Sequence, residues 1–353
     1  MLTNVKPVTL FSLMLGIASF IGLLIWQGIG EVTSTLATAG WGLTVVAAFH
    51  LIPMLSSGVC WRILLPARHR LPLSRLVEAR WIGESINSIL PVAQIGGEFA
   101  KARWVMRNSN QRNGIPGSVA GSSVVVEVTI SLLTQIIFTI IGLSALLFYL
   151  DLNSHLVVEV AVGIAIMIAL LMAFYASQHH NLFERVAHLL EKISGGKQWL
   201  KLSGGANTLD QAIVNIYSRK TALATASAWR LLSWFLGIGE VWLIMYFLGH
   251  PISLMEALLL ESLGQAIRAA GFLIPASLGV QEGGFLLLGI VLGIPSQTAL
   301  ALSLGKRIRE LILGIPGLII WQIGTWKTGA GQRLSQHRQG KDQADQNPEH
   351  VIE

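Results

Sequence analysis

The sequence contains little charge and a single cysteine. Only 12% of its 353 residues are charged and 52% are hydrophobic, whereas about 25% of an ordinary globular chain is charged. Cys60 alone cannot build a disulfide framework or a cysteine zinc site. The sequence also has no His-Glu-x-x-His, P-loop, Gly-x-Ser-x-Gly or dinucleotide-binding glycine pattern. We therefore predict neither a cofactor nor a metal site.

Long hydrophobic stretches take the place of these motifs. About 20 apolar residues cross the ~30 Å hydrocarbon core of a bilayer, and six stretches are at least that long. They are 8–29, 41–61, 117–150, 156–176, 221–248 and 296–326. Trp41, Trp61 and Trp326 lie near their ends, as in an interfacial aromatic belt. We therefore predict an all-α integral membrane protein with about six transmembrane helices.

The positions of Lys and Arg predict the orientation. They gather in 62–80, 101–112, 178–220 and the tail after 326, whereas 30–40, 151–155 and 249–255 contain none. Short cytoplasmic loops carry the excess of Lys and Arg, so both termini are expected in the cytoplasm. The net charge of +6 is then explained by topology, and we expect membrane lipids as partners and no nucleic acid.

Two segments, 80–105 and 256–294, are too polar for lipid-facing helices and too apolar for loops. In each, two aliphatic residues precede a proline, and a glutamate follows the proline seven positions later with glycine between. These residues are Ile89, Leu90, Pro91, Gly96, Gly97 and Glu98, and then Leu273, Ile274, Pro275, Gly279 and Glu282. Proline interrupts helical hydrogen bonding and glycine permits unusual backbone shapes. We expect a broken helix in each segment.

The charge pattern predicts that the two broken helices are re-entrant hairpins from opposite faces of the membrane. This gives two units of span, hairpin and span, over about 41–150 and 221–326. They would form an inverted repeat, as in many transporters. Residues 1–326 would be one membrane domain, with 178–220 as a cytoplasmic connector. Irregular backbone at membrane depth must be buried or line a cavity, so the two breaks should face each other.

Charged side chains inside the predicted membrane domain should gather at the same place. Each costs at least ~2.5 to 3.5 kcal/mol in hydrocarbon. The candidates are Glu84, Glu98, Glu127, Arg230, Glu240, Glu261, Arg268, Glu282, Arg307 and Glu310. The spacing of Glu261, Gln265 and Arg268 places them on one helical face. His50 is expected to hydrogen-bond across helices rather than bind a metal.

Two further parts of the chain have a distinct composition. Residues 181–193 form an amphipathic pattern that predicts a helix in the cytoplasmic interface, either as a cover over the span ends or as a lipid sensor. The tail, 327–353, is rich in Gln, Asp, Gly and Lys and is predicted to be disordered.

Three stretches resemble a known family. They are 89–105 (ILPVAQIGGEFAKARWV), 274–283 (IPASLGVQEG) and 302–321 (LSLGKRIRELILGIPGLIIW). They look like the transmembrane region of the lysylphosphatidylglycerol synthase/flippase family, more narrowly its stand-alone bacterial branch associated with hopanoid biosynthesis. The resemblance extends over nearly the whole chain to about residue 326.

The resemblance implies a lipid-handling, multi-pass protein of the bacterial inner membrane. The sequence holds no soluble aminoacyl-transferase domain after its membrane part, so we do not expect lysyl transfer. We predict a flippase or transporter for a lipid with a polar headgroup. A hopanoid-related lipid is the candidate that the narrower resemblance implies, with hopanoid-biosynthesis proteins as candidate partners. An interfacial lipid-modifying enzyme with Glu98 or Glu127 as general base, and a scaffold for hopanoid biosynthesis, stay open as alternatives.

The predicted substrate-binding residues come from both broken helices and their neighbours. They are Pro91, Gly96, Gly97, Glu98, Arg103, Glu127, Arg268, Pro275, Gly279, Glu282, Arg307 and Glu310. Helix N-termini attract anions, and the arginines, including Arg103, are suited to clamp a phosphate. Glu98 and Glu282 would bind a cationic group or coupling protons, or they would hold the hairpins in shape by pairing with arginine.

Overall fold

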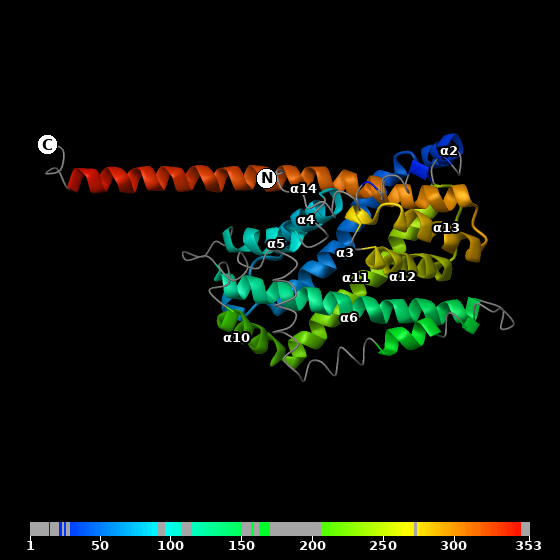
Figure 1. Ribbon diagram of the computed structural model, residues 1–353, viewed down its shortest axis with the longest axis horizontal. Coiled ribbons are helices and arrows are strands. Elements are labelled where there is room, and N and C mark those ends of the chain that lie inside the picture. The colour runs from blue at the N-terminus through cyan, green and yellow to red at the C-terminus, as the bar shows by residue number, and fades with distance from the viewer. Residues whose placement is uncertain are drawn as a thin grey trace.

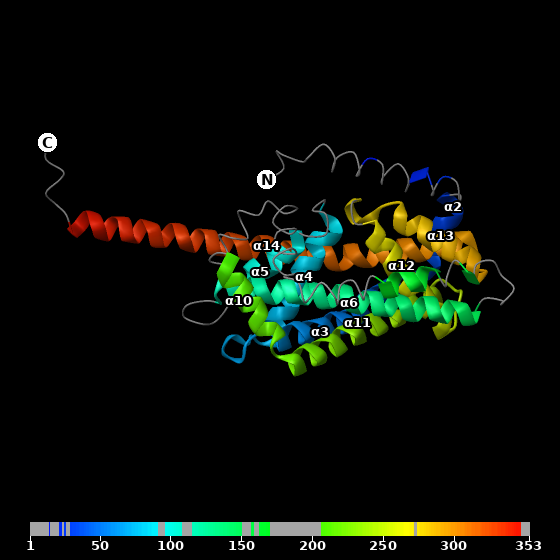
Figure 2. The same ribbon diagram turned by 60° about the horizontal axis from the view of Figure 1, so that its bottom comes forward.

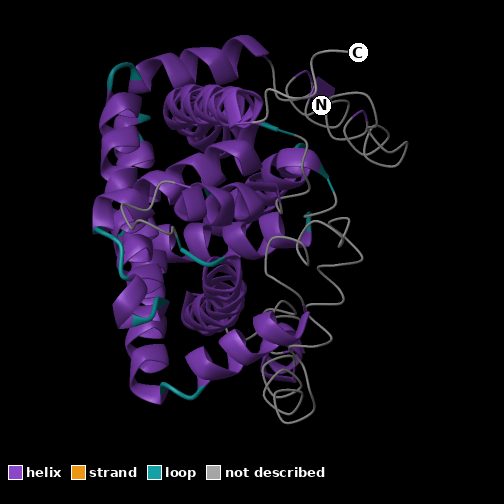
Figure 3. Ribbon diagram, turned by 90° about the vertical axis from the view of Figure 1, so that its left-hand side faces the viewer, coloured by secondary structure: helices purple, strands orange, loops and turns teal. Residues whose placement is uncertain are grey.

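The computed structural model describes residues 29–90, 96–107, 115–149, 206–271 and 274–346, together with Met14, Ile21, Gly22, Ile25, 157–158 and 162–169. All regular elements in these ranges are helices (Figures 1 and 3). The prediction of an all-α protein is therefore confirmed.

The helices follow one another in two similar series. The elements are α2 (Ile29–Ala39), α3 (Gly42–Leu64), η1 (Ala67–His69), α4 (Leu73–Ile89), α5 (Gly96–Arg107), α6 (Gly117–Tyr149), α10 (Ala206–Tyr217), α11 (Lys220–Phe247), α12 (Leu254–Ala270), η2 (Pro275–Ser277), α13 (Val280–Leu292) and α14 (Ser296–Gln346). In each series a long helix precedes two shorter ones, and another long helix follows. The first series is α3 to α6 and the second is α11 to α14.

Three helices of the described part are long and apolar enough to cross a membrane. These are α3, α6 and α11, and they match the predicted stretches 41–61, 117–150 and 221–248. Helix α14, which includes the predicted stretch 296–326, is not among them, and four charged residues lie at 306–310 within that stretch. The predicted stretches 8–29 and 156–176 fall largely outside the described residues, so the number of six crossings stays a prediction.

Both half-polar segments consist of two helices separated by a break, as predicted. Helix α4 ends at Ile89 and α5 begins at Gly96, and Pro91 lies outside the described residues. Helix α12 ends at Ala270, and α13 begins after a turn in which Ala276 has a φ of 52° and Gly279 a φ of 78°. A positive φ is uncommon for a residue with a side chain, so this turn is held by its surroundings.

The helices of the two series pack across one another. Helix α3 packs along α11, and each short hairpin packs within itself, α4 on α5 and α12 on α13. Helix α4 also packs on α14, while α12 packs on α6 (Figure 2). Each series therefore places its first short helix against the last long helix of the other series. Both broken segments are thereby brought next to the α3 and α11 pair.

A close backbone approach holds the first hairpin together. A Cβ atom on Gly97 would lie 2.0 Å from the backbone oxygen of Gly83 and 2.6 Å from Cγ of Asn87. The amide of Gly97 donates to Oδ1 of Asn87 at 2.8 Å. Because any side chain at position 97 would collide with α4, the glycine there is required for α5 to lie against α4.

The connector and the tail are described in part. The predicted amphipathic helix at 181–193 lies outside the described residues, but α10 buries Ile213 and Ile216 and packs on α6. Helix α14 continues to Gln346 and extends away from the other helices (Figure 1), and 347–353 lie outside the described residues, so the disorder of 327–353 stays a prediction. Gln, Lys and Arg have good helix propensity, and elongation of an existing helix needs no new nucleus. The tail composition excludes a core but does not exclude a helix.

Candidate polar cavity in the membrane domain

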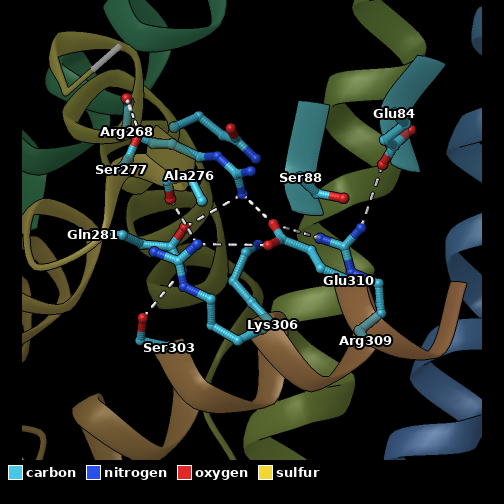
Figure 4. A network of polar contacts seen from close by, with 12 residues as sticks. Glu84, Ser88, Arg268, Ala276, Ser277, Gln281, Ser303, Lys306, Arg309 and Glu310 are labelled. Atoms are coloured by element: carbon cyan, nitrogen blue, oxygen red, sulfur yellow. Dashed lines mark hydrogen bonds and ion pairs between the residues drawn. The ribbon is translucent and has the colours of Figure 1, made fainter. Parts of the chain in front are cut away.

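A polar cavity of about 230 Å³ lies between α3, α4, α5, α11, α12 and α14. Ionisable side chains from all six helices line it. The basic ones are Arg80, Lys101, Arg230, Arg268, Lys306 and Arg309, the acidic ones are Glu84, Glu98, Glu240, Glu261 and Glu310, and His50 lies with them. The predicted gathering of charged residues next to the two breaks is thus present in the structure. Figure 4 shows the part of this network around α14.

His50 of α3 connects two carboxylates from other helices. Its Nδ1 lies 2.6 Å from Oε2 of Glu240, and its Nε2 lies 2.8 Å from Oε1 of Glu84. Nε2 also lies 3.0 Å from Nη1 of Arg309. An unprotonated Nε2 can accept from Arg309 and a protonated Nε2 can donate to Glu84, so the cluster accommodates both states. The predicted role of His50 as a link between helices is confirmed.

Lys306 of α14 is buried against α12. Its Nζ lies 2.6 Å from Oε2 of Glu261, and the side chains of Lys306 and Glu261 are 4% and 5% exposed. Oε1 of Glu261 accepts a hydrogen bond of 2.8 Å from Nε2 of Gln265 one turn along the helix. Glu240 lies 3.7 Å from Lys306 and 3.2 Å from Nε of Arg309. The charges that α14 brings into the core are therefore compensated by carboxylates from α11 and α12.

A second buried ion-pair cluster joins α4, α5 and α6. Glu127, 2% exposed, accepts from Nη1 of Arg80 at 2.7 Å and from Nζ of Lys101 at 2.5 Å. Lys101 also lies 2.6 Å from Oε2 of Glu98. The sequence assigns Arg80 and Lys101 to cytoplasmic clusters, whereas the structure buries them beside the cavity. Their partner Glu127 explains the difference, because its negative charge offsets part of the desolvation cost of the two cations.

Arg268 and Arg307 both pair with Glu310, and Arg307 has Glu282 as a second and closer carboxylate partner. Arg268 of α12 binds Glu310 of α14 and points toward it in Figure 4. Arg307 binds Oε1 of the fully buried Glu282 at 3.1 Å and donates to the carbonyl oxygen of Ala276 at 2.6 Å. Glu310 lines the cavity with Arg268, whereas Arg307 holds the second break in place behind it.

Glu282 has the contacts of a structural residue. Its Oε2 accepts from the amide of Gly279 at 2.7 Å, and its Oε1 accepts from Oγ of Ser303 at 3.2 Å. It is 0% exposed and does not line the cavity. Glu98 differs, because its side chain is 24% exposed and does line the cavity. The two glutamates, equivalent in sequence, therefore have different surroundings.

A second, less polar cavity adjoins the first. It has a volume of about 300 Å³ and is lined on the α6 side by Val124, Val125, Val128 and Leu132. Leu132 is among the exposed hydrophobic residues of α6. The two cavities share Arg80, Asn87, Glu98, Arg230, Trp234, Gln265 and Arg268 in their linings. A polar cavity thus meets a less polar one, with valine and leucine on its α6 side, at a junction that carries three arginines.

The predicted site residues divide into three groups. Glu98, Arg268 and Glu310 line the polar cavity, and Glu127 lines the adjoining one. Gly96, Gly97, Pro275, Gly279, Glu282 and Arg307 lie in the breaks or behind them. Arg103 is exposed on α5 and lies in neither lining. Pro91 is outside the described residues.

Sequence reasoning did not select several residues that line the cavity. Arg80, Lys101, Lys306 and Arg309 were all visible as charges in or next to hydrophobic stretches, and this was the signal that could have identified them. Their carboxylate partners are distant in sequence, as with Arg80 and Glu127, which are separated by 47 positions. Serines and Trp234 carry no such signal, because these residue types are ordinary in membrane helices.

Comparison with known proteins identifies the family. Residues 13–317 match the family described as lysylphosphatidylglycerol synthase TM region. The chain belongs to this family. All the charged residues of the cavity fall within the matched range. The resemblance inferred from the three short stretches is thereby confirmed at the level of the family.

One curated relative supports the same assignment. The chain is 22% identical over 325 residues to the UPF0104 membrane protein PH1989 of Pyrococcus horikoshii, a match that covers 87% of this chain and 93% of the relative. No solved structure matches the chain. The family, the relative and the apolar helices agree that this is a membrane protein, and the family points to a role connected with lipids.

Proposed function

We propose that this protein moves a lipid with a polar headgroup between the two leaflets of the bacterial inner membrane. The headgroup would enter the polar cavity while the acyl chains stay in hydrocarbon. The observation that carries the proposal is the junction of the polar cavity with the less polar cavity beside α6, which valine and leucine side chains line on one side. An amphiphilic lipid needs such a pair of compartments, whereas a soluble substrate needs only the polar one.

The arrangement of the helices supports this proposal. Helices α3 to α6 and α11 to α14 have the same order of long and short members, and α4 packs on α14 as α12 packs on α6. Such exchanged packing is expected for an inverted repeat whose site lies between the halves. We propose that 41–150 and 221–326 are these repeats, with two re-entrant hairpins, six crossings and cytoplasmic termini.

The identity of the lipid is a finer proposal. The family is described by lysylphosphatidylglycerol synthase, which favours a glycerophospholipid or another lipid with a charged headgroup. The resemblance of the sequence to the hopanoid-associated branch favours a hopanoid-related lipid and partners from hopanoid biosynthesis. A comparison of lipids co-purified with the protein, measured by native mass spectrometry, distinguishes these classes.

Lipid translocation can be measured in proteoliposomes that contain fluorescently labelled phosphatidylglycerol. Dithionite quenches label in the outer leaflet alone, so a fall below half of the starting fluorescence reports movement. We expect movement with wild type and with Arg103→Gln, which changes an arginine outside the cavity, and slower movement with Glu98→Gln. No movement of any labelled lipid by folded wild-type protein would overturn the proposal.

A lipid-modifying enzyme is less well supported by the structure. Both carboxylate oxygens of Glu127 already accept hydrogen bonds from cations, Arg80 and Lys101. Glu127 is therefore less available to take a proton from a substrate as a general base. Glu98 pairs with Lys101 as well. Loss of one lipid species from a deletion strain would favour the enzyme, whereas an unchanged lipid inventory with altered leaflet distribution would favour movement. A scaffold would leave both unchanged.

A further inference from the structure

Arg230 of α11 differs from the other cations that line the cavity. Its Nε and Nη2 lie 3.1 and 2.6 Å from Oγ of Ser131, and its Nη1 lies 2.6 Å from Oγ of Ser57. The guanidinium lies over the ring of Trp234, 4.7 Å from the centroid. Arg230 is 7% exposed. Within the described ranges, no carboxylate lies within 4.0 Å of it.

The other cations that line the cavity have carboxylate partners. Arg80 and Lys101 bind Glu127, Arg268 binds Glu310, and Lys306 and Arg309 bind Glu261 and Glu240. A buried cation without a counter-charge is costly. The hydroxyl oxygens and the aromatic ring around Arg230 lower that cost, but they carry no negative charge that would neutralise the guanidinium. Arg230 is therefore a buried cation that, among the described residues, has hydroxyl and aromatic partners but no direct carboxylate partner.

The position of Arg230 is where a headgroup would meet its acyl chains. It lines both cavities together with Arg80 and Arg268. Ser131, which accepts from Arg230, lies in the lining of the less polar cavity. Within the described part of the chain the Ser131 hydroxyl donates to no acceptor, so its proton can be given to a ligand. In a glycerolipid the phosphate is the group located between the polar headgroup and the chains.

We propose that Arg230 is the primary ligand of a phosphate group at the junction of the two cavities, with Ser131 as a second donor. Guanidinium groups bind phosphate in bidentate fashion, and the phosphate would be an anion in direct contact with Arg230. This inference rests on the proposed function, because it takes the junction as the path of the lipid. It adds that the substrate class is a lipid phosphate.

The test is a binding measurement in detergent micelles on the full chain. The probes are dihexanoyl phosphatidylglycerol, inorganic phosphate and dihexanoylglycerol, which lacks phosphate. We expect wild type and Arg62→Gln, which changes an exposed arginine of α3 outside both cavities, to bind the phosphatidylglycerol alike. Arg230→Gln should bind it on the order of tenfold more weakly, and the affinity of Arg230→Lys should lie between the two. Dihexanoylglycerol should bind all of these proteins equally weakly.

The unliganded variant provides a second readout. Because Arg230 has no direct carboxylate partner and its burial is costly, Arg230→Gln should unfold at the same temperature as wild type or at a higher one. A merely structural Arg230 predicts a lower unfolding temperature with unchanged phosphatidylglycerol binding, and that result would overturn the proposal. If Arg230→Gln fails to fold, Arg230→Lys carries the test, because it keeps the charge and loses the bidentate geometry.

The probes also separate the sources of phosphate. If inorganic phosphate binds as tightly as phosphatidylglycerol, the site is one for free phosphate, and the proposal that it binds a lipid phosphate is overturned. The inference and the proposed function can fail separately. Wild type that moves lipid while Arg230→Gln binds phosphatidylglycerol normally refutes the inference alone. Arg230-dependent binding by a protein that moves no lipid refutes the proposed function alone.

Discussion

Replacement of Lys306 by methionine tests whether the charges in the cavity wall are matched as the structure shows. Lys306 and Glu261 are 4% and 5% exposed and 2.6 Å apart. After Lys306→Met, Glu240 keeps His50 and Arg309 as partners, but among the described residues Glu261 keeps only the amide of Gln265. The substitution thus leaves one buried carboxylate without a cation. Removal of one partner of a buried ion pair costs about 3–5 kcal/mol.

A double substitution shows whether the lost stability comes from the unpaired carboxylate. Because Lys306→Met with Glu261→Gln removes both charges, it should recover most of the lost free energy, since a buried pair replaced as a whole is often neutral. Lys220→Met, at an exposed position at the start of α11, should stay within about 0.5 kcal/mol of wild type.

Reversible unfolding in mixed micelles, followed by far-ultraviolet circular dichroism, gives the free energy of each variant. Two results would refute the reasoning. In one, Lys306→Met is as stable as Lys220→Met. In the other, the double variant is no more stable than Lys306→Met.

Three further predictions concern single positions. Gly97→Ala should lower the free energy of unfolding by about 1–3 kcal/mol, because a Cβ there would lie 2.0 Å from the backbone oxygen of Gly83. Gly283→Ala should be tolerated, because a Cβ at that position would have no atom within 4 Å. Equal stability of the two variants in the same denaturation assay would contradict the packing of α5 on α4. Glu282→Gln should lower the free energy of unfolding by about 1–3 kcal/mol through loss of its buried hydrogen bonds. Glu98→Gln should slow lipid movement with little change in melting temperature. A destabilised Glu98→Gln together with slow lipid movement by a stable Glu282→Gln would contradict these roles. Cys60, which is 0% exposed, should react with maleimide in denatured protein but not in native protein, and rapid native labelling would show that α3 is packed differently.

The hairpins and their breaks were predictable because proline and glycine act locally. The rule that proline and glycine interrupt a helix identified breaks next to Ile89 and Ala270, and the structure has both. The long apolar helices α3, α6 and α11 were predictable for the same reason, since their length and composition are continuous in the sequence.

The pairing of charges was not predictable, because it depends on contacts between distant helices. Arg80 and Lys101 were assigned to the cytoplasm by the positive-inside rule, yet both bind Glu127 of α6. The rule counts charges along the chain and cannot recognise a partner that folding brings to them. Likewise, the different surroundings of Glu98 and Glu282 arise from Lys101 on one side and Ser303 on the other, which the shared sequence pattern does not contain.

The central claim is that a lipid headgroup passes through the polar cavity, and a block placed in the cavity tests it most directly. Ser88 lines the cavity, and Ser88→Cys in a Cys60→Ala background provides one thiol there for a charged methanethiosulfonate reagent. The account predicts that modification stops the movement of labelled phosphatidylglycerol in proteoliposomes, and that reduction with dithiothreitol restores it. Full modification of the thiol with an unchanged rate of movement would contradict the account.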